Sequence, residues 1–208
     1  WFDEGATISA SASRTLPELW RLLSHIDAVH GAYYLLMHGW FALFPPTEFW
    51  SRFPSSLAIG AAAAGVTVFT RQFSTRPTAV CAGAIFAILP RTTWAGMEAR
   101  PYAFVAAATV WLTALFVVTV RRNKSRAWVC YALGLMLSIL LNLNLVLLVP
   151  VYGAMLPLLA PKGARRSPVL WWAASSAVAV AVTTPFLVFA HNQVWQVNWI
   201  DPVSWHYA

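Results

Sequence analysis

Charged residues are scarce in this sequence. Only 10% of its 208 residues are Asp, Glu, Lys or Arg, whereas 59% are hydrophobic and the mean hydropathy is +0.61. A soluble domain needs a more polar surface than this composition supplies, so the composition excludes an ordinary soluble protein. We therefore expect lipid to be the solvent around most of the chain.

Acidic residues are scarcer than basic ones. The sequence has 7 Asp and Glu against 14 Lys and Arg, a formal net charge of +7. In a soluble protein this excess would favour nucleic acid as a partner. Here the basic residues form short clusters between apolar runs, as they do in the cytoplasmic loops of membrane proteins. We therefore predict membrane lipids as partners and no nucleic acid.

The sequence has few cysteines and shows no targeting signal. Cys81 and Cys130 both lie inside apolar runs, where a thiol behaves as a small hydrophobe without a loop partner to oxidise with. The chain begins at Trp1 and runs at once into Asp3-Glu4, without the charged and apolar regions of a signal peptide. We expect the chain to be a piece of a longer protein.

Long apolar runs dominate the rest of the sequence. There are five, over Ser55–Thr70, Thr78–Leu89, Ala103–Val120, Ala127–Ala160 and Val169–Ala190. The fourth run is too long for one crossing, because about 20 helical residues span the hydrocarbon core. Asn142 and Asn144 near its middle predict two short helices joined by a tight turn near Leu141–Asn144. The predicted fold class is all-α, a polytopic transmembrane helix bundle.

The charges of the loops predict which side each loop faces, because Lys and Arg in short loops favour the cytoplasm. If Ser55–Thr70 runs inward, every strong basic cluster falls on the cytoplasmic face: Arg71 with Arg76, Arg121 to Arg126, and Lys162 to Arg166. The opposite face then receives the segments that contain Asp3, Glu4, Asp27, Glu98 and Asp201. We predict a multi-pass protein of the cell membrane whose active face is extracytoplasmic.

One apolar stretch would reverse this assignment if it crossed the membrane. His30–Phe44 has only 15 residues, includes two histidines and is followed by Pro45-Pro46. We interpret it as an interfacial or half-inserted helix on the outer side. A capping box over Thr15–Glu18 predicts another short amphipathic helix on the membrane surface before it.

These predictions divide the chain into three parts. Residues 1–54 form a first extracytoplasmic loop with interfacial helices, 55–190 form the transmembrane helices, and 191–208 begin a further extracytoplasmic loop.

Side chains able to carry chemistry gather in the outer segments. Asp3 and Glu4 are adjacent carboxylates. They are either solvated acids of a loop, or one is a general base and the other positions it or helps bind a cation. Arginine binds phosphate oxygens through its planar fork and keeps its charge. The further outer residues are Asp27, His30, Arg52, Glu98, Arg100 and Tyr102. Each alone is more often a cap, an anchor or an ion pair, but together they suit a lipid-linked phosphate sugar.

The order of these residues resembles a known family. The series is Phe2-Asp3-Glu4, Asp27-x-x-His30 with Tyr33-Tyr34-Leu35-Leu36, Glu48-x-x-x-Arg52-x-Pro54-Ser55, and Glu98-Ala99-Arg100-Pro101-Tyr102-Ala103. It is similar to the membrane-embedded C-type glycosyltransferases, especially the bacterial relatives of the protein O-mannosyltransferases and of the lipid A aminoarabinose transferase. The resemblance covers roughly residues 1–160.

The resemblance implies a reaction and a set of roles. A sugar, with mannose as the first candidate, would pass with inversion from a polyprenyl-phosphate donor to a lipid or protein acceptor of the cell envelope. Asp3 would be the catalytic base, and Glu4 would support it. Arg52 would hold the active-site loop or the donor phosphate, and Arg100 with Tyr102 would lie near the site.

The chain also departs from the family pattern. Many relatives have proline after the second aspartate, where Asp27-Ala28-Val29-His30-Gly31 stands here, so the role of His30 is open. Asn142 or Asn144 stands where relatives often carry a histidine, so no metal role is transferred to that region. No cofactor is predicted, and a requirement for a divalent metal is left open.

Tryptophans are frequent at the edges of the outer segments. The first interpretation is the aromatic belt of a membrane protein. The alternative is that some of them stack on sugars, above all in the segment from Trp195 to Trp205, which also contains Asp201 and His206.

Two other functions compete with the enzyme. A transporter or lipid flippase would place polar residues along a path through the membrane. A structural subunit with a degenerate site is the third possibility.

Overall fold

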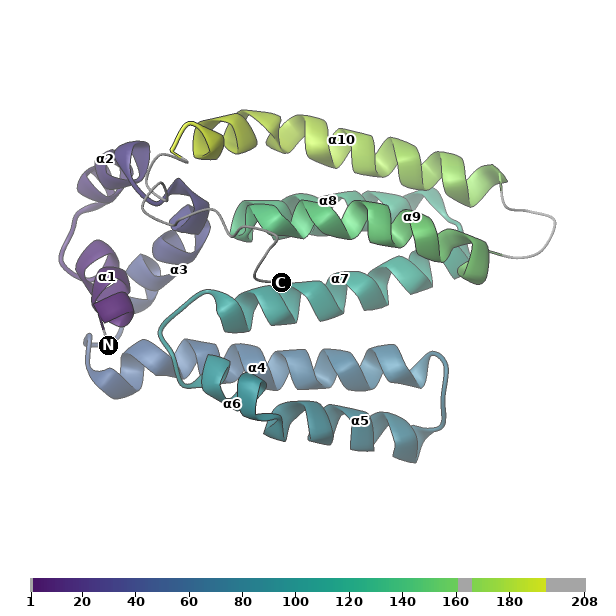
Figure 1. Ribbon diagram of the computed structural model, residues 1–208, viewed down its shortest axis with the longest axis horizontal. Helices are drawn as coiled ribbons and strands as arrows, with labels where there is room; N and C mark the ends of the chain where they lie inside the picture. The colour runs from purple at the N-terminus through teal and green to yellow at the C-terminus, as the bar shows by residue number, and fades with distance from the viewer. Residues whose placement is uncertain (1, 161–165, 194–208) are drawn as a thin grey trace, which may run out of the picture.

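The computed structural model describes residues 2–160 and 166–193, with residues 2 and 3 described by their backbone alone (Figure 1). Within these ranges all regular structure is helical. The elements are α1 (Phe2–Ser11), α2 (Leu16–His25), η1 (Ala28–His30), α3 (Gly31–Phe41), α4 (Glu48–Arg71), α5 (Arg76–Ile88), α6 (Pro90–Gly96), α7 (Tyr102–Arg122), α8 (Ser125–Leu141), η2 (Leu143–Leu147), α9 (Leu148–Leu159) and α10 (Arg166–His191). The predicted all-α class is confirmed.

Three of the described helices are long and apolar enough to span a membrane. These are α4, α7 and α10, with 24, 21 and 26 residues. At about 1.5 Å per residue, α7 alone is roughly 31 Å long, which matches the hydrocarbon thickness of a bilayer. The apolar run Ser55–Thr70 lies inside α4, which begins seven residues earlier, at Glu48, and includes Pro54.

The fourth apolar run forms the predicted hairpin. Helix α8 ends at Leu141, and the chain returns through η2 and α9 alongside it (Figure 1). The side chain of Asn142 accepts a hydrogen bond from the backbone N–H of Asn144 at 3.0 Å, which satisfies a backbone donor where the helix stops. The prediction of two short helices joined near Leu141–Asn144 is therefore confirmed.

The second apolar run ends at a sharp break. Helices α5 and α6 meet at an angle of 65°, and they make a fourth candidate span only if the bent pair is counted as one. Pro90 is the cause, because the residue before a proline is driven out of the helical region. Leu89 accordingly adopts an extended conformation with ψ 134°.

Small residues allow α4 to pack closely on its neighbours. On the α5 side, a Cβ added to Gly83 would lie 2.0 Å from Thr67 Oγ1 and 2.8 Å from the carbonyl oxygen of Ala63. On the α7 side, the indole of Trp111 donates a hydrogen bond to the carbonyl of Ala61 at 2.9 Å. Close approach through small residues is the usual way that membrane helices associate.

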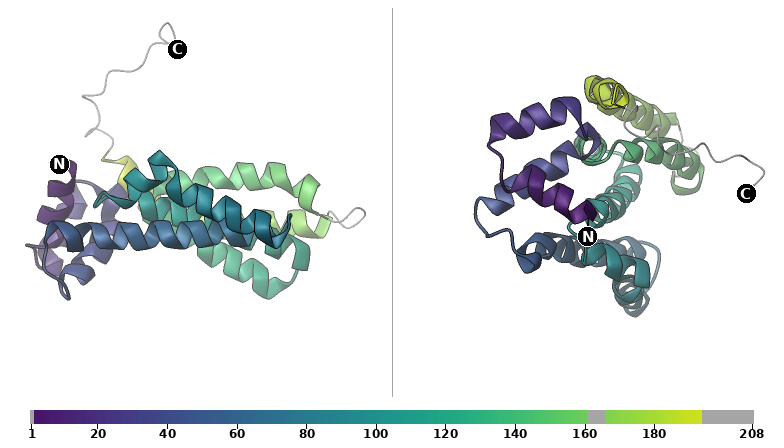
Figure 2. Two further views of the ribbon diagram at one scale, coloured as in Figure 1. Left: turned by 90° about the horizontal axis from the view of Figure 1, so that it is seen from below. Right: turned by 60° about the vertical axis from the view of Figure 1, so that its left-hand side comes forward.

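The helices before α4 gather at one end of the bundle (Figures 1 and 2). Helix α3 has 11 residues, so the prediction that His30–Phe44 does not cross the membrane is supported by its length. Helix α2 begins with the predicted capping box, in which Glu18 accepts a hydrogen bond from the backbone N–H of Thr15 at 2.8 Å. Gln193, just beyond α10, closes this end by bonding to the N–H of Ala28 and the carbonyl of Leu23.

The two ends of the bundle differ in charge. At one end lie the turns from α4 to α5 and from α7 to α8 and the start of α10. All charged residues there are basic: Arg71, Arg76, Arg121, Arg122, Lys124, Arg126 and Arg166. The end with α1, α2, α3 and α6 contains every Asp and Glu of the described residues, together with five arginines (Figure 1). One end is therefore basic and the other is of mixed charge.

Candidate functional site

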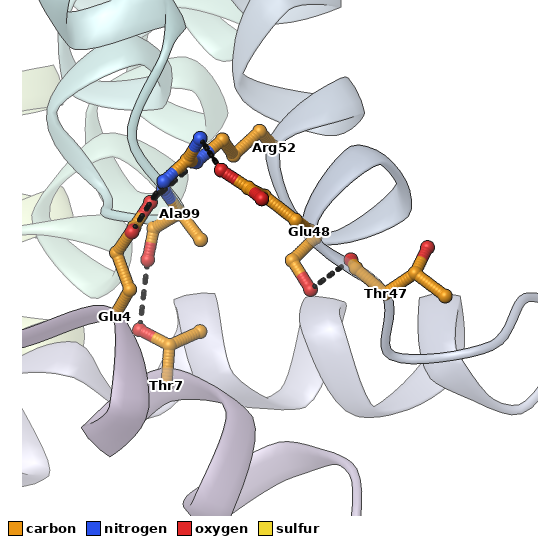
Figure 3. Close-up of polar contacts among 7 residues, drawn as sticks. Glu4, Thr7, Thr47, Glu48, Arg52 and Ala99 are labelled. Carbon is orange, nitrogen blue, oxygen red and sulfur yellow. Dashed lines mark hydrogen bonds and ion pairs between the residues drawn. The ribbon is translucent and has the colours of Figure 1, made fainter. Parts of the chain in front are cut away.

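An ion pair between two distant segments forms the centre of the mixed-charge end (Figure 3). Arg52, in the second turn of α4, donates from Nε and Nη2 to the two carboxylate oxygens of Glu4 in α1, both at 2.9 Å. Side by side, the two hydrogen bonds form the bidentate fork that gives arginine–carboxylate pairs their strength. The Glu4 side chain is only 9% exposed. The pair therefore fixes the first turn of α1 to the start of α4.

The third donor group of Arg52 is also occupied. Its Nη1 donates to Glu48, one turn earlier on α4, whose carboxylate is largely exposed. Two carboxylates and one guanidinium leave this cluster with one excess negative charge. Of the two roles expected for Arg52, the geometry therefore favours holding the loop, because a phosphate here would meet carboxylates instead of free donors.

Glu4 is held as a carboxylate. The guanidinium of Arg52 is the main reason that the pKa of Glu4 falls from its ordinary value of 4.5 to about 2, and the hydrogen bond from Ala99 adds to this, although burial opposes it. A group this acidic, with both oxygens accepting hydrogen bonds, is a poor proton acceptor at neutral pH. This environment suits Glu4 to positioning the neighbouring residues of α1, not to accepting a proton as a general base.

A third segment is tied to the same pair. The backbone N–H of Ala99 donates to Glu4 at 3.0 Å, and its carbonyl oxygen accepts a hydrogen bond from Thr7 of α1 at 2.9 Å (Figure 3). Both backbone polar groups of this buried residue therefore bond to α1. In this way α1, the start of α4 and the segment between α6 and α7 are joined into one unit.

Two hollows flank this unit. One, of about 380 Å³, is lined by Glu4, Gly5, Ile8, Glu48, Ser51, Arg52 and Ala99. The other, of about 540 Å³, is lined by Thr47, Glu48, Phe49, Arg52, Phe53, Ser56 and Met97. Their volumes fall in the range of small-molecule sites, roughly 300–1,000 Å³. The mixed-charge end thus has room for a sugar-sized group beside the ion pair.

Asp27 and His30 lie in a second polar group, around η1. Asp27 has a left-handed backbone with φ 58° and accepts a hydrogen bond from Tyr34 at 3.3 Å. His30 packs edge-on against the ring of Tyr34 and is largely buried, and its Nδ1 has no hydrogen-bond partner within the described residues. Burial lowers the pKa of His30, opposed by Asp27 and reinforced by Arg100, which favours the neutral imidazole.

Arg100 and Tyr102 lie at the start of α7. Arg100 donates a hydrogen bond to the Tyr102 hydroxyl at 3.1 Å, and its guanidinium lies over the Tyr102 ring, 5.4 Å from the centroid. Arg100 also acts electrostatically on His30, and it directly follows Ala99 in the sequence. Six of the seven predicted site residues therefore have described side chains at one end of the bundle: Glu4, Asp27, His30, Arg52, Arg100 and Tyr102.

Some predicted residues lie outside the described part of the chain. Asp3 belongs to the first turn of α1, but its side chain lies outside the described residues. The segment from Trp195 to Trp205, with Asp201 and His206, lies outside them entirely. For metals, no three His, Cys, Asp or Glu side chains within the described ranges are grouped so that they could hold an ion.

Thr7 and the backbone of Ala99 are members of the site that were not predicted from the sequence. Neither has a local signal, because each is defined by contact with a segment more than ninety residues away. Glu48 did have a signal, since glutamate and arginine four residues apart pair on a helix face. The pairing of Glu48 with Arg52 was nevertheless not predicted.

Comparison with protein-family models, with curated proteins and with solved structures finds no match to this chain.

Proposed function

We propose that this chain belongs to a C-type glycosyltransferase that moves a sugar, mannose as first candidate, from a polyprenyl-phosphate donor to a cell-envelope acceptor. The reaction takes place at the mixed-charge end, which faces the extracytoplasmic side. The observation that carries the proposal is the Glu4–Arg52 pair with its flanking hollows. The pair fixes the first turn of α1, to which Asp3 belongs, and lines a space of sugar size.

Asp3 is the general base in this proposal. Its carboxylate takes the proton of the acceptor hydroxyl while that oxygen attacks the anomeric carbon. The bond between the anomeric carbon and the phosphate oxygen breaks, and its electrons leave with polyprenyl phosphate. Attack from the face opposite the leaving group inverts the anomeric carbon. Glu4 and Arg52 hold α1 in place and do not exchange protons.

The positions of the charges support an enzyme over a transporter. In α4, α7 and α10 every Asp, Glu, Lys, Arg and His lies within the first or last two turns. A translocation path would place such groups near the middle of the membrane. The proposal does require spans in addition to these three helices, and the shorter apolar helices α8 and α9 are the first candidates.

The test is sugar transfer by membranes that contain the protein. Membranes are incubated with radiolabelled polyprenyl-phosphate mannose, and label in the acceptor fraction is compared for the wild type and Asp3→Asn. We expect the substitution to reduce the rate at least about a hundredfold, as loss of a general base does. Glu18→Gln on α2 is the control and should transfer normally. Unchanged transfer by Asp3→Asn would contradict the assignment of the base.

A further inference from the structure

The break between α5 and α6 encloses a separate hollow. It has a volume of about 240 Å³, and its walls include Ile59, Phe86, Arg91, Thr92, Trp94 and Tyr102. The contributing helices are α4, α5, α6 and α7, so the hollow exists only because Pro90 bends the chain back across α4. Its size is below that of sites for drug-sized molecules and suits a small head group.

Arg91 is the cation of this hollow and differs from Arg52. Its guanidinium lies over the indole of Trp94, 4.6 Å from the ring centroid. Within residues 2–160 and 166–193 it makes no hydrogen bond or ion pair, whereas every donor group of Arg52 meets a carboxylate. An arginine held by an aromatic ring, with its donors available, is suited to bind an anion.

The aromatic walls of the hollow are open to the surroundings. Trp94 and Tyr102 are 49% and 46% exposed, so large ring surfaces are available for stacking. Arg100 lies over the Tyr102 ring and adds a second positive charge on that side. The walls therefore combine positive charge with flat apolar surface.

An exposed apolar surface on α5 lies next to the hollow in sequence. Ile85 and Ile88, next to Phe86 on α5, are 58% and 75% exposed, although α5 belongs to a candidate membrane span. Hydrocarbon is the natural neighbour of such side chains in a bilayer. An anion that reaches Arg91 from this direction would carry an apolar tail.

We propose that this hollow binds the phosphate group of a membrane lipid, with Arg91 as its ligand and the lipid tail along Ile85 and Ile88. The inference rests on the proposed function only in identifying that lipid with the sugar donor. Ile59 lies seven residues beyond Arg52 on α4, about 10 Å along the helix. The hollow is thus near enough to the Glu4–Arg52 pair to present a sugar to it, and it supplies the phosphate site that Arg52 does not.

The test is direct binding. The chain, reconstituted in phosphatidylcholine nanodiscs, is titrated with radiolabelled polyprenyl monophosphate, and Arg91→Gln is compared with the wild type. We expect Kd to rise at least about tenfold, the effect of losing charge-assisted hydrogen bonds. Arg121→Gln is the matched control, because Arg121 also lies over a ring, that of Phe73 at 4.7 Å, but at the basic end. Its Kd should stay within about twofold of the wild type.

Three results would overturn the proposal: wild-type binding by Arg91→Gln, equal binding of uncharged polyprenol, or inorganic phosphate that binds as tightly as the lipid. Arg91→Lys, which keeps the charge, should bind between the two and guards against a folding defect in Arg91→Gln. Because binding is measured without transfer, the two hypotheses fail separately. Wild-type binding by Arg91→Gln together with lost transfer by Asp3→Asn refutes the lipid site alone. Weakened binding by Arg91→Gln together with unchanged transfer by Asp3→Asn refutes the proposed reaction alone.

Discussion

At the scale of single residues, the adjacent carboxylates of α1 have different environments. Glu4 is buried, paired with Arg52 and bonded to the Ala99 peptide, so it acts as a structural anion. The sequence pointed to Glu4 and Arg52 as members of one site but could not show that they pair. They are 48 residues apart, and only the tertiary structure, in which α1 packs on α3, brings their side chains together.

Loss of the Glu4 charge should destabilise this end of the molecule. The fall of its pKa from 4.5 to about 2 corresponds to roughly 3 kcal/mol at about 1.4 kcal/mol per pKa unit, so Glu4→Gln should lose stability of that order. Because the folded-state pKa is the lower one, this stabilisation is present above pH 4.5 and is lost as the pH falls towards 2.

Thermal unfolding of the purified protein between pH 6 and pH 2.5 measures this effect. The wild type should lose stability in acid more steeply than Glu4→Gln, which lacks this titrating group. Glu98→Gln is the control, because Glu98 makes no hydrogen bond or ion pair within the described residues. Equal stability of Glu4→Gln and the wild type at pH 6 would show that the pair contributes nothing.

At the scale of elements, small residues and prolines determine how the helices meet. The hairpin of α8 and α9 was predictable, because two asparagines interrupt an apolar run that is too long for one crossing. The 65° break between α5 and α6 was not predicted, although Pro90 directly follows the apolar run. The direction in which α6 turns depends on its contact with α4, where Ser56 donates a hydrogen bond to the carbonyl of Gly96 at 2.8 Å.

Two glycines provide a matched test of helix packing. Gly83→Ala places a methyl group against Thr67 and the Ala63 carbonyl, so it should cost about 1–3 kcal/mol by forcing α5 away from α4. A Cβ on Gly60 of α4 meets nothing within 4 Å, so Gly60→Ala should be neutral or stabilising by up to about 1 kcal/mol. Melting temperatures in one detergent compare the two variants. Equal melting temperatures would contradict the close packing of α4 and α5.

At the scale of the whole molecule, the directions of the helices determine at which end each charged loop lies. Helices α4, α7 and α9 run towards the basic end, and α5, α8 and α10 run away from it (Figure 1). Every turn whose charged residues are all basic therefore lies at that end. The side assignment made from loop charges agrees with this arrangement, provided that α3 does not cross the membrane.

Cysteine accessibility tests that arrangement. With Cys81 and Cys130 replaced by alanine, single cysteines are introduced as Glu98→Cys and Lys124→Cys, which lie at opposite ends of α7. In intact cells a membrane-impermeant maleimide should label position 98 and not position 124. Labelling of position 124 from outside would reverse the orientation and place the candidate site in the cytoplasm.

The sequence by itself determined that the chain is helical and suited to lipid, where its long apolar helices lie, and how charge divides between its loops. Those properties depend on composition, on apolar runs and on local signals such as the capping box at Thr15 and the asparagines near residue 142. Only the tertiary structure decided which charges neutralise each other. Glu4 and Glu48 hold Arg52, whereas Arg91 makes no hydrogen bond or ion pair within the described residues, because α1 packs on α3 and α6 turns back across α4. No local pattern encodes a contact between segments so far apart.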